Sequence, residues 1–219
     1  MFPPAAGPTW KDSYSDATTS LDRGVNRVAE RARGWVIIHA MPKTSVAVFG
    51  SSQASRNSPH YNVARELGTV LAKGGAVIRC GGYGGVMEAV ASGAKEAGGT
   101  VIGCTLNWFG ESRVANSNLD QVIEAPDLAS RLGCLLRDTR GAVFLHGGVG
   151  TLNELLWVWT LLMHDRDEGP QSIALLGDHW EELMAFLTKR FEIAPPIRQL
   201  VRIAATPEEA AAIAWGTTV

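Results

Sequence analysis

The sequence predicts an α/β fold in which one parallel β-sheet is covered by helices on both faces. From residue 44 onward, short apolar runs rich in β-branched residues alternate with segments of helical periodicity. The apolar runs are continuous, which is the pattern of strands buried on both sides. Strands and helices that alternate along a chain are typical of a parallel sheet. We therefore expect a Rossmann-like, doubly wound parallel sheet flanked by helices on both faces.

A helical period follows each expected strand except the one over residues 100–104. The strands are expected over residues 45–50, 76–80, 100–104, 121–125, 142–146 and 172–176. The helices between and after them are expected near residues 59–73, 85–97, 127–138, 151–164 and 179–191. A last helix follows Thr206 and Pro207, which suit an N-cap and a first helical position. Because ligands of such sheets bind at the carboxyl ends of strands, the residues after each strand are the candidates for function.

The N-terminal part of the chain is expected to lie outside the main domain. Residues 1–20 are rich in Pro, Ser, Thr and Asp, which is typical of poorly ordered segments. Residues 21–33 place their apolar side chains on one helical stripe and predict a short helix. We expect a partly disordered extension over residues 1–40 and a single nucleotide-binding domain over residues 41–219.

Composition and charge narrow the classes of function. Hydrophobic residues make up 46% and charged residues 19%, which are ordinary values for a globular domain. The formal net charge of -2 gives no broad attraction to nucleic acid or to anionic membranes. No run is long enough for a membrane-spanning helix, and the N-terminus lacks the pattern of a secretory signal. The three cysteines are widely spaced and form no Cys/His cluster, so we expect no metal site and a reducing, cytoplasmic setting.

Two glycine-rich segments echo each other at the ends of expected strands. Residues 75–88 read GAVIRCGGYGGVME, and residues 141–154 read GAVFLHGGVGTLNE. Each is a buried strand, a Gly-Gly-x-Gly turn and a helix start that carries a glutamate. Glycine lets a ligand approach the backbone closely, and a helix start presents free N–H groups and the positive end of its dipole. Together they predict a site for a phosphorylated ligand.

A third candidate loop follows the first strand. The residues expected to contact the ligand are Gly50, Ser51, Ser52, Gly81, Gly82, Gly84, Gly85, Met87, Glu88, Gly147, Gly148, Val149, Gly150 and Thr151. The alternative is that the glycines only permit tight packing of strands on helices. The P-loop pattern GxxxxGK[ST] is absent, and GxGxxG fails because Met87 and Asn153 occupy its third glycine position.

Glu154 and Arg131 are the charged candidates. Glu154 stands one turn into the helix after the second glycine-rich turn, within reach of a bound ribose. Thr151 and Glu154 also have the spacing of a capping box, which has no catalytic role. Arg131 lies near the start of the helix after residues 121–125 and could hold a phosphate or a base. It could equally be a solvated surface arginine, which the sequence alone favours.

At these residues the sequence resembles the LONELY GUY (LOG) family and its relatives, often described as possible lysine decarboxylases and including molybdenum cofactor carrier proteins. The LOG signature PGGxGTxxE matches residues 146–154 except that His146 replaces the proline. VFGSSQ, LAKGG and GGYGGVMEA extend the resemblance over roughly residues 44–190. No lysine lies in a motif that suggests a Schiff base, so a pyridoxal-phosphate lysine decarboxylase is a distant third hypothesis.

The resemblance implies an enzyme. LOG proteins are phosphoribohydrolases, which cleave the N-glycosidic bond of nucleoside 5′-monophosphates such as AMP and cytokinin nucleotides, without a metal or cofactor. It implies that the loop over residues 147–151 holds the 5′-phosphate, helped by Ser51 and Ser52. It also implies that Glu154 faces the ribose and that Arg131 corresponds to the catalytic arginine of the family's HERK stretch.

Two departures from the LOG pattern keep an alternative open. The HERK stretch reads Ala129-Ser130-Arg131-Leu132, so its lysine is missing. GGVMEA is more similar to the carrier proteins, which bind a phosphorylated pterin. The alternative function is therefore a non-catalytic binder or carrier of a phosphorylated cofactor such as molybdenum cofactor.

The helix over residues 151–164 suggests a partner. Its stretch LLWVWTLLM is apolar nearly all the way round, and one face of a sheet cannot bury such a helix completely. We expect a homodimer through this helix, as the resemblance also implies. The alternative is that the N-terminal segment wraps it.

Overall fold

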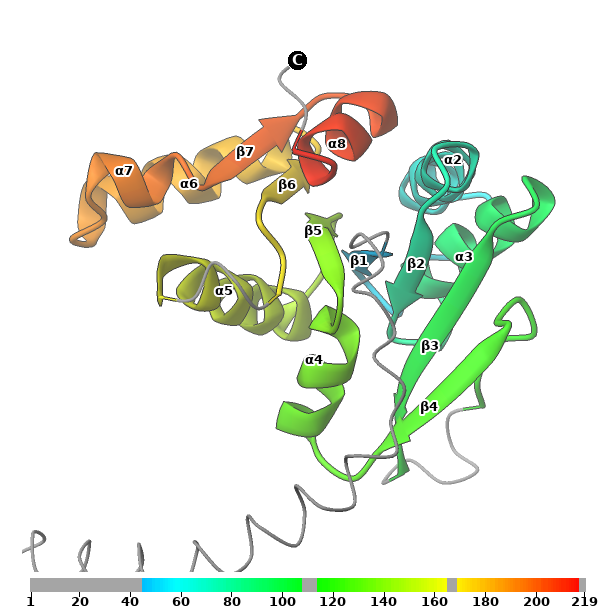
Figure 1. Ribbon diagram of the computed structural model, residues 1–219. Coiled ribbons are helices and arrows are strands. Elements are labelled where there is room, and N and C mark those ends of the chain that lie inside the picture. Colours follow the sequence, from blue (N-terminus) through cyan, green and yellow to red (C-terminus); the bar gives the residue numbers. More distant parts are fainter. Residues whose placement is uncertain (1–44, 108–113, 165–168, 217–219) are drawn as a thin grey trace, which may run out of the picture. The chain divides into compact units, whose positions relative to one another are not determined.

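A parallel sheet forms the centre of the domain that the structure describes (Figure 1). The computed structural model describes residues 45–107, 114–164 and 169–216, so the expected extension over 1–40 and its helix over 21–33 lie outside the described residues. In the described part of the chain, seven strands have the order β4-β3-β2-β1-β5-β6-β7. They are β1 (Ser45–Phe49), β2 (Val77–Cys80), β3 (Thr100–Leu106), β4 (Gln121–Ala125), β5 (Thr139–Phe144), β6 (Ile173–Leu176) and β7 (Val201–Ala204).

The strand order fixes where a ligand can enter. The chain builds β1 to β4 toward one edge of the sheet and then returns to place β5, β6 and β7 on the other side of β1. All neighbouring strands pair in parallel. The loops after β1 and β5 therefore diverge to opposite faces, and a crevice opens between them at this switch point. The expected α/β class with a doubly wound parallel sheet is confirmed.

Helices cover both faces of the sheet (Figure 1). Those of the described residues are α2 (Pro59–Lys73), α3 (Val86–Glu96), α4 (Leu128–Leu136), α5 (Val149–His164), α6 (His179–Arg190), α7 (Pro195–Arg198) and α8 (Pro207–Ala214). Side chains of α2, α3 and α8 share one hydrophobic cluster with the sheet, and side chains of α4, α5 and α6 share the other. No helix in the described part of the chain is long and apolar enough to cross a membrane.

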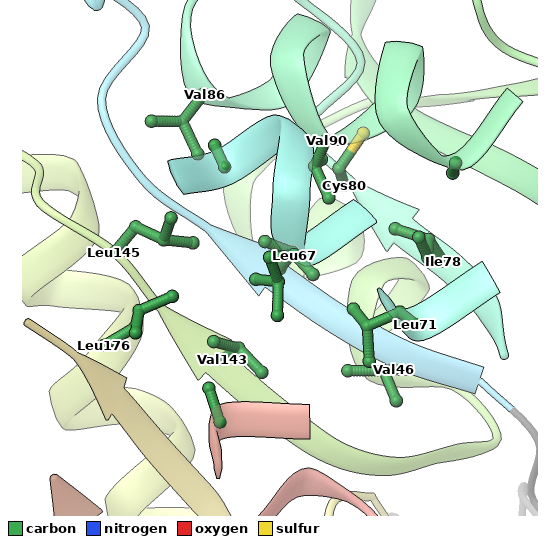
Figure 2. Close-up of a cluster of buried hydrophobic side chains, with 14 of the residues drawn as sticks. Val46, Leu67, Leu71, Ile78, Cys80, Val86, Val90, Val143, Leu145 and Leu176 are labelled. Atoms are coloured by element: carbon green, nitrogen blue, oxygen red, sulfur yellow. The ribbon is translucent and has the colours of Figure 1, made fainter. Parts of the chain in front are cut away.

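The two clusters explain the continuous apolar runs. Val46 in β1 points into the first cluster, where Figure 2 shows it beside Leu71 of α2. The next residue, Ala47, belongs to the second cluster. Phe49 and Phe144 stack in that second cluster with ring centroids 4.6 Å apart. Because successive strand residues point to opposite faces, every position of β1 must be apolar or small.

Side-chain caps define several helix starts. Ser58 accepts a hydrogen bond from the Tyr61 N–H at the start of α2. Asp127 does the same for the Ser130 N–H at the start of α4. Thr206 caps α8 by accepting from the Glu209 N–H, with Pro207 at the first helical position, so the prediction for the last helix is confirmed. Such caps satisfy N–H groups that the helix itself leaves without an acceptor.

The expected boundaries near the second glycine-rich segment need correction. β5 covers residues 139–144 rather than 142–146, and α5 begins at residue 149 rather than 151. Pairing with β6 ends at Phe144, so the next residues leave the sheet early and the helix starts early. The sequence reading also missed β7 and α7, which are each four residues long.

The cysteines also differ from the expectation. Cys104 in β3 and Cys134 in α4 form a disulfide with a Cα–Cα distance of 6.2 Å, although 30 residues separate them in sequence. Wide spacing along the chain had favoured reduced thiols, but spacing does not report contacts between a strand and the helix that covers it. Cys80 is a buried free thiol.

Candidate functional site

A cavity of about 250 Å³ opens at the switch point of the sheet. Its walls come from the loops after β1, β2 and β5, from the end of β3 and from the first turns of α3, α4 and α5. The expected site residues that line it are Gly50, Ser51, Ser52, Gly81, Met87, Arg131, Gly148, Gly150, Thr151 and Glu154. Three loops that were identified separately in the sequence therefore meet at one place.

Ser51 ties the three loops together through its backbone. Its N–H donates to the carbonyl of His146 at 3.0 Å, in the loop after β5. Its carbonyl accepts from the N–H of Val86 at 2.8 Å, at the start of α3. A movement of any one loop would break a hydrogen bond to another. The rim of the cavity is thus one connected piece of backbone.

The first turn of α5 faces this cavity. The helix begins at Val149, and the first N–H groups of a helix have no acceptor within it. They leave a positive end that favours a phosphate. Gly147 makes room for the side chain of Thr151, since a Cβ at residue 147 would lie 2.1 Å from the Thr151 Oγ1.

Arg131 and Glu154 form an ion pair at the wall of the cavity. The Arg131 Nη1 lies 3.2 Å from the Glu154 Oε1, and the two side chains are only 13% and 18% exposed. The Arg131 Nε donates to the Cys104 carbonyl at 2.8 Å. A Cβ at Gly81 would lie 2.1 Å from the Arg131 Nη2, so a larger residue at position 81 would displace the guanidinium. These contacts fix the guanidinium between β2, β3 and α5.

The ion pair corrects two interpretations of the sequence. Arg131 is not a solvated surface arginine, because its side chain is mostly buried against the cavity wall. Thr151 and Glu154 do not form a capping box, because α5 starts before Thr151 and the Glu154 carboxylate accepts from Arg131. Both charged side chains instead point to the space where a ligand would bind.

Burial determines the electrostatics of Glu154. Loss of water around its carboxyl raises the pKa above the usual glutamate value, and the positive charge of Arg131 partly opposes this rise. A carboxylate with a raised pKa beside a cation is typical of functional sites. The pair can place negative charge next to a ligand without exposing it to bulk water.

Some expected site residues lie outside the cavity lining. These are Gly82, Gly84, Gly85, Glu88, Gly147 and Val149. The carboxylate of Glu88 pairs with Arg56 instead, a side chain that is 76% exposed. Val149 is 85% exposed and points to solvent. The two glycine-rich segments are therefore similar in sequence but unequal in their contribution to the cavity.

Six further residues of the cavity wall were not predicted from the sequence, and most of them are apolar. They are Gln53, Tyr83, Leu106 and Leu128, together with Val48 and Phe49 at the end of β1. The Tyr83 hydroxyl accepts a hydrogen bond from the Leu106 N–H at 2.8 Å, which holds the ring in place. Tyr83 could have been found, because it is the one residue with a side chain inside the GGYGG turn. Leu106 and Leu128 carry no signal of their own in the sequence.

Comparison with known proteins shows the family of this chain. Residues 87–213 match a family model described as possible lysine decarboxylase. The chain belongs to this family. The resemblance to LOG proteins is confirmed by two curated relatives that are 30% and 31% identical to this chain.

Two curated relatives of the family are named phosphoribohydrolases. A probable cytokinin riboside 5′-monophosphate phosphoribohydrolase of Oryza sativa subsp. japonica is 30% identical over 172 residues, covering 75% of this chain and 67% of the relative. A cytokinin riboside 5′-monophosphate phosphoribohydrolase of Mycobacterium marinum is 31% identical over 125 residues, covering 55% of this chain and 64% of the relative.

Solved structures with the same fold are described differently. The molybdenum cofactor carrier protein of Chlamydomonas reinhardtii is 26% identical with a TM-score of 0.55, covering 76% of this chain and 92% of the carrier. The molybdenum cofactor binding protein of Rippkaea orientalis is 24% identical with a TM-score of 0.57, covering 75% of this chain and 90% of that protein, and shows the fold alone.

His146, which departs from the LOG signature, lies in a group of three histidines. Its ring stacks on His60 of α2 with centroids 4.1 Å apart, and the ring of His179 in α6 is 5.2 Å away. Burial and the two neighbouring imidazoles lower the pKa of His179. Within the described ranges, no group of three or more His, Cys, Asp or Glu side chains is arranged to hold a metal ion.

Proposed function

We propose that this protein is a nucleoside 5′-monophosphate phosphoribohydrolase. The reaction adds water across the N-glycosidic bond and releases a free base and ribose 5-phosphate. The observation that carries the proposal is the ion pair of Arg131 and Glu154 beside the first turn of α5, inside one cavity. The names of the curated relatives support it.

The phosphate is proposed to bind at the first turn of α5. Free backbone N–H groups and the helix dipole favour an anion there, and Thr151 adds a hydroxyl. Ser51 and Ser52 line the same cavity from the loop after β1. In this arrangement the ribose extends toward Glu154, which stands one turn further along the helix.

Glu154 is proposed to act on the sugar ring. As the bond from C1′ to the base nitrogen breaks, positive charge develops on the ribose, and a nearby carboxylate stabilises that charge. Water then adds its oxygen to C1′, and the base nitrogen takes up a proton. Arg131 orients the carboxylate through their hydrogen bond. As proposed, the reaction draws its charges from these two side chains and uses no metal or cofactor.

The base is proposed to occupy the apolar side of the cavity. Tyr83, Met87, Leu106 and Leu128 line that side. The Tyr83 ring and the aliphatic side chains suit the faces of a planar base, and they would select a base by its shape. The substrate class proposed is AMP-like nucleotides, including those with an apolar substituent on the base.

The decisive experiment is incubation of the pure protein with AMP and with prenylated AMP, followed by chromatography for free base. Glu154→Gln should lower base release about 100- to 1,000-fold, in the range typical for loss of one electrostatic group. The matched control is Glu88→Gln, since Glu88 holds the equivalent position in the other glycine-rich segment but pairs with Arg56. Absence of base release from a panel of nucleotides would contradict the proposal.

The second candidate is a non-catalytic carrier of a phosphorylated cofactor such as molybdenum cofactor. The observation that favours it is the likeness to carrier structures, together with Tyr83 and Met87 in the cavity wall from the carrier-like GGYGGVMEA segment. Native mass spectrometry of the purified protein tests it. Retention of a pterin that stays intact would favour the carrier, whereas a nucleotide that is turned over would favour the enzyme.

A homodimer through α5 is part of the proposal. Leu152, Leu156, Trp157 and Met163 are exposed along this helix, although most of the chain buries residues of these types. Exposed apolar patches of this kind mark interaction sites. A cytoplasmic location also belongs to the proposal, because nucleoside monophosphates are metabolites of that compartment.

A further inference from the structure

The disulfide between Cys104 and Cys134 joins the two elements that hold Arg131 of the ion pair. Cys104 belongs to β3, and Cys134 belongs to α4, the helix that carries Arg131. The Cα–Cα distance of 6.2 Å lies within the range that a disulfide requires. The bond therefore joins the sheet covalently to the helix that positions a proposed functional side chain.

Both cysteines are linked to arginines through their backbone carbonyls. The Cys104 carbonyl accepts from the Arg131 Nε at 2.8 Å. The Cys134 carbonyl accepts from the Arg79 Nη1 at 3.0 Å. Arg131 and Cys134 are three residues apart in α4, so they lie on the same face of the helix. A change in the spacing between the two cysteines must change the setting of Arg131.

Reduction would move α4 rather than β3. Two thiols cannot remain at bonding distance, so their sulfur atoms must separate when the bond is broken. Cys104 is fully buried, and its strand is paired on both sides, with β2 and with β4. By contrast, α4 has nine residues, and Leu128 in its first turn is 58% exposed. The helix is the part that can shift, and a shift of α4 changes the position of Arg131 relative to Glu154.

We propose that Cys104 and Cys134 form a reversible thiol–disulfide modification site whose oxidised form holds Arg131 in its working position. The inference rests on the proposed function for its effect on rate, but not for its effect on structure. A disulfide in a reducing compartment is usually a transient, regulatory one, which agrees with the proposed cytoplasmic setting. The reaction partner is a low-molecular-weight thiol such as glutathione.

The chemistry of the switch is thiol–disulfide exchange. A glutathione thiolate attacks the sulfur of Cys134, which is the partly exposed member of the pair, and the Cys104 sulfur leaves and takes up a proton. A second glutathione thiolate attacks the mixed disulfide, which frees the Cys134 thiol and forms oxidised glutathione. Oxidation is the reverse of these steps, and oxidised glutathione then accepts the two electrons.

Cys80 provides an internal reference. It is fully buried, and burial raises the pKa of its thiol to about 11. It therefore stays a protonated, unreactive thiol at neutral pH in both states. Of the three cysteines, one should be free in the oxidised protein and three in the reduced protein.

The test compares the full chain equilibrated with oxidised or with reduced glutathione. Alkylation after denaturation, read by mass, should give one label in the first case and three in the second. Amide hydrogen exchange of residues 128–136 should be faster in the reduced protein, because α4 loses its covalent tether. The thermal midpoint should fall by roughly 5 to 10 °C on reduction, as expected for a loop of this length. The rate of base release from AMP should be at least tenfold lower for the reduced protein than for the oxidised protein.

Two variants distinguish the role of the Cys104–Cys134 pair from that of Cys80. Cys134→Ser should behave like the reduced protein and lose its response to glutathione. Cys80→Ala is the matched control, because it removes a buried thiol but keeps the pair and should keep the full response. Three labels in oxidised glutathione, or the same α4 exchange in both states, would overturn the inference.

The same measurements distinguish failure of the proposed enzyme function from failure of the proposed modification site. Redox-dependent exchange in α4 without base release from any nucleotide would support the modification site and contradict the enzyme. Base release at the same rate in both redox states would support the enzyme and contradict the modification site.

Discussion

Glu88 and Glu154 occupy equivalent positions in the two glycine-rich segments, yet each pairs with a different arginine. Glu154 meets Arg131 at the wall of the cavity, and Glu88 meets Arg56 near solvent. The difference arises because α4 packs over the sheet beside α5 and delivers Arg131 there. Equivalent backbone positions thus give one buried charge pair and one peripheral pair. At the residue scale, the chemistry depends on which arginine reaches each glutamate.

The raised pKa of Glu154 predicts the pH dependence of base release. The reaction as proposed needs the ionised carboxylate, so the rate falls as pH drops through the pKa of this group. That fall should lie above the ordinary glutamate value of about 4.3, because burial raises the pKa. Arg131→Gln should move it to still higher pH, since Arg131 lowers the pKa. The measurement is kcat/KM against pH, and Arg56→Gln is the control that should leave the profile unchanged.

Gly147 predicts a test of the proposed phosphate site. In Gly147→Ala the new Cβ would meet the Thr151 Oγ1 and displace that side chain. Loss of one hydrogen bond to a charged ligand contributes about 1.5–3 kcal/mol, so nucleotide affinity should fall about tenfold or more. Titration calorimetry with AMP measures it.

The control for Gly147→Ala is a glycine elsewhere with free space around it. In Gly133→Ala, within α4, the new Cβ meets nothing within 4 Å. This variant should keep the affinity and gain about 0.5–1 kcal/mol of stability. Equal affinities of the two variants for AMP would argue against Thr151 as a phosphate ligand.

Most of the candidate site was predictable at the level of loops but not of side-chain partners. Glycine-rich turns after strands are local patterns, so Ser51, Gly81 and Gly148 could be assigned from the sequence. The partner of Arg131 depends on how α4 packs over the sheet, which no local pattern encodes. The same reason hid the contact between Cys104 and Cys134.

At the scale of elements, α5 packs one face on the sheet and exposes another face to solvent. Leu155 and Val158 are buried against the sheet, while Leu156 and Trp157 on the other face are exposed. A groove of about 380 Å³ runs along this outer face. The helix therefore has a second apolar face that the described residues do not cover.

The outer face of α5 predicts the effect of a charge on assembly. Trp157→Lys should convert a dimer to a monomer, because an unpaired ammonium would be buried in the contact. Analytical ultracentrifugation measures the mass in solution. The matched control is Phe186→Lys on α6, where the side chain is 55% exposed compared with 47% for Trp157. An unchanged mass of the Trp157→Lys variant would contradict assembly through α5.

Elements were predictable in proportion to their length and periodicity. The bounds of α2 and β4 match the sequence prediction, because their patterns are complete and their ends carry turn or capping residues. β7 was missed because it is a short edge strand with Arg202 exposed in its middle. The early end of β5 depends on the end of β6, which lies in another part of the chain.

At the scale of the whole molecule, the sheet and both hydrophobic clusters are built by residues 45–216. Each strand of the described sheet and each member of the two clusters lies in this range. The domain division at residue 40 remains a prediction of the sequence.

That division predicts the behaviour of a shortened protein. A chain of residues 41–219 should fold and keep the thermal midpoint of the full chain within a few degrees, because the two clusters supply most of the stability. Differential scanning calorimetry of both proteins measures this. A large loss of stability would show that residues 1–40 complete the domain. The matched control is a chain that lacks residues 207–219. This truncation removes α8, so the shortened chain should not fold.

The contact between α2 and α8 carries a consequence for biosynthesis. These helices pack against each other on the same face of the sheet, although one precedes most of the chain and the other follows it. During synthesis on the ribosome, α2 emerges long before α8, which packs against it. The nascent chain must therefore keep the part of α2 that α8 covers exposed until residue 214 has left the exit tunnel. A chaperone that shields this surface would raise the yield of folded protein.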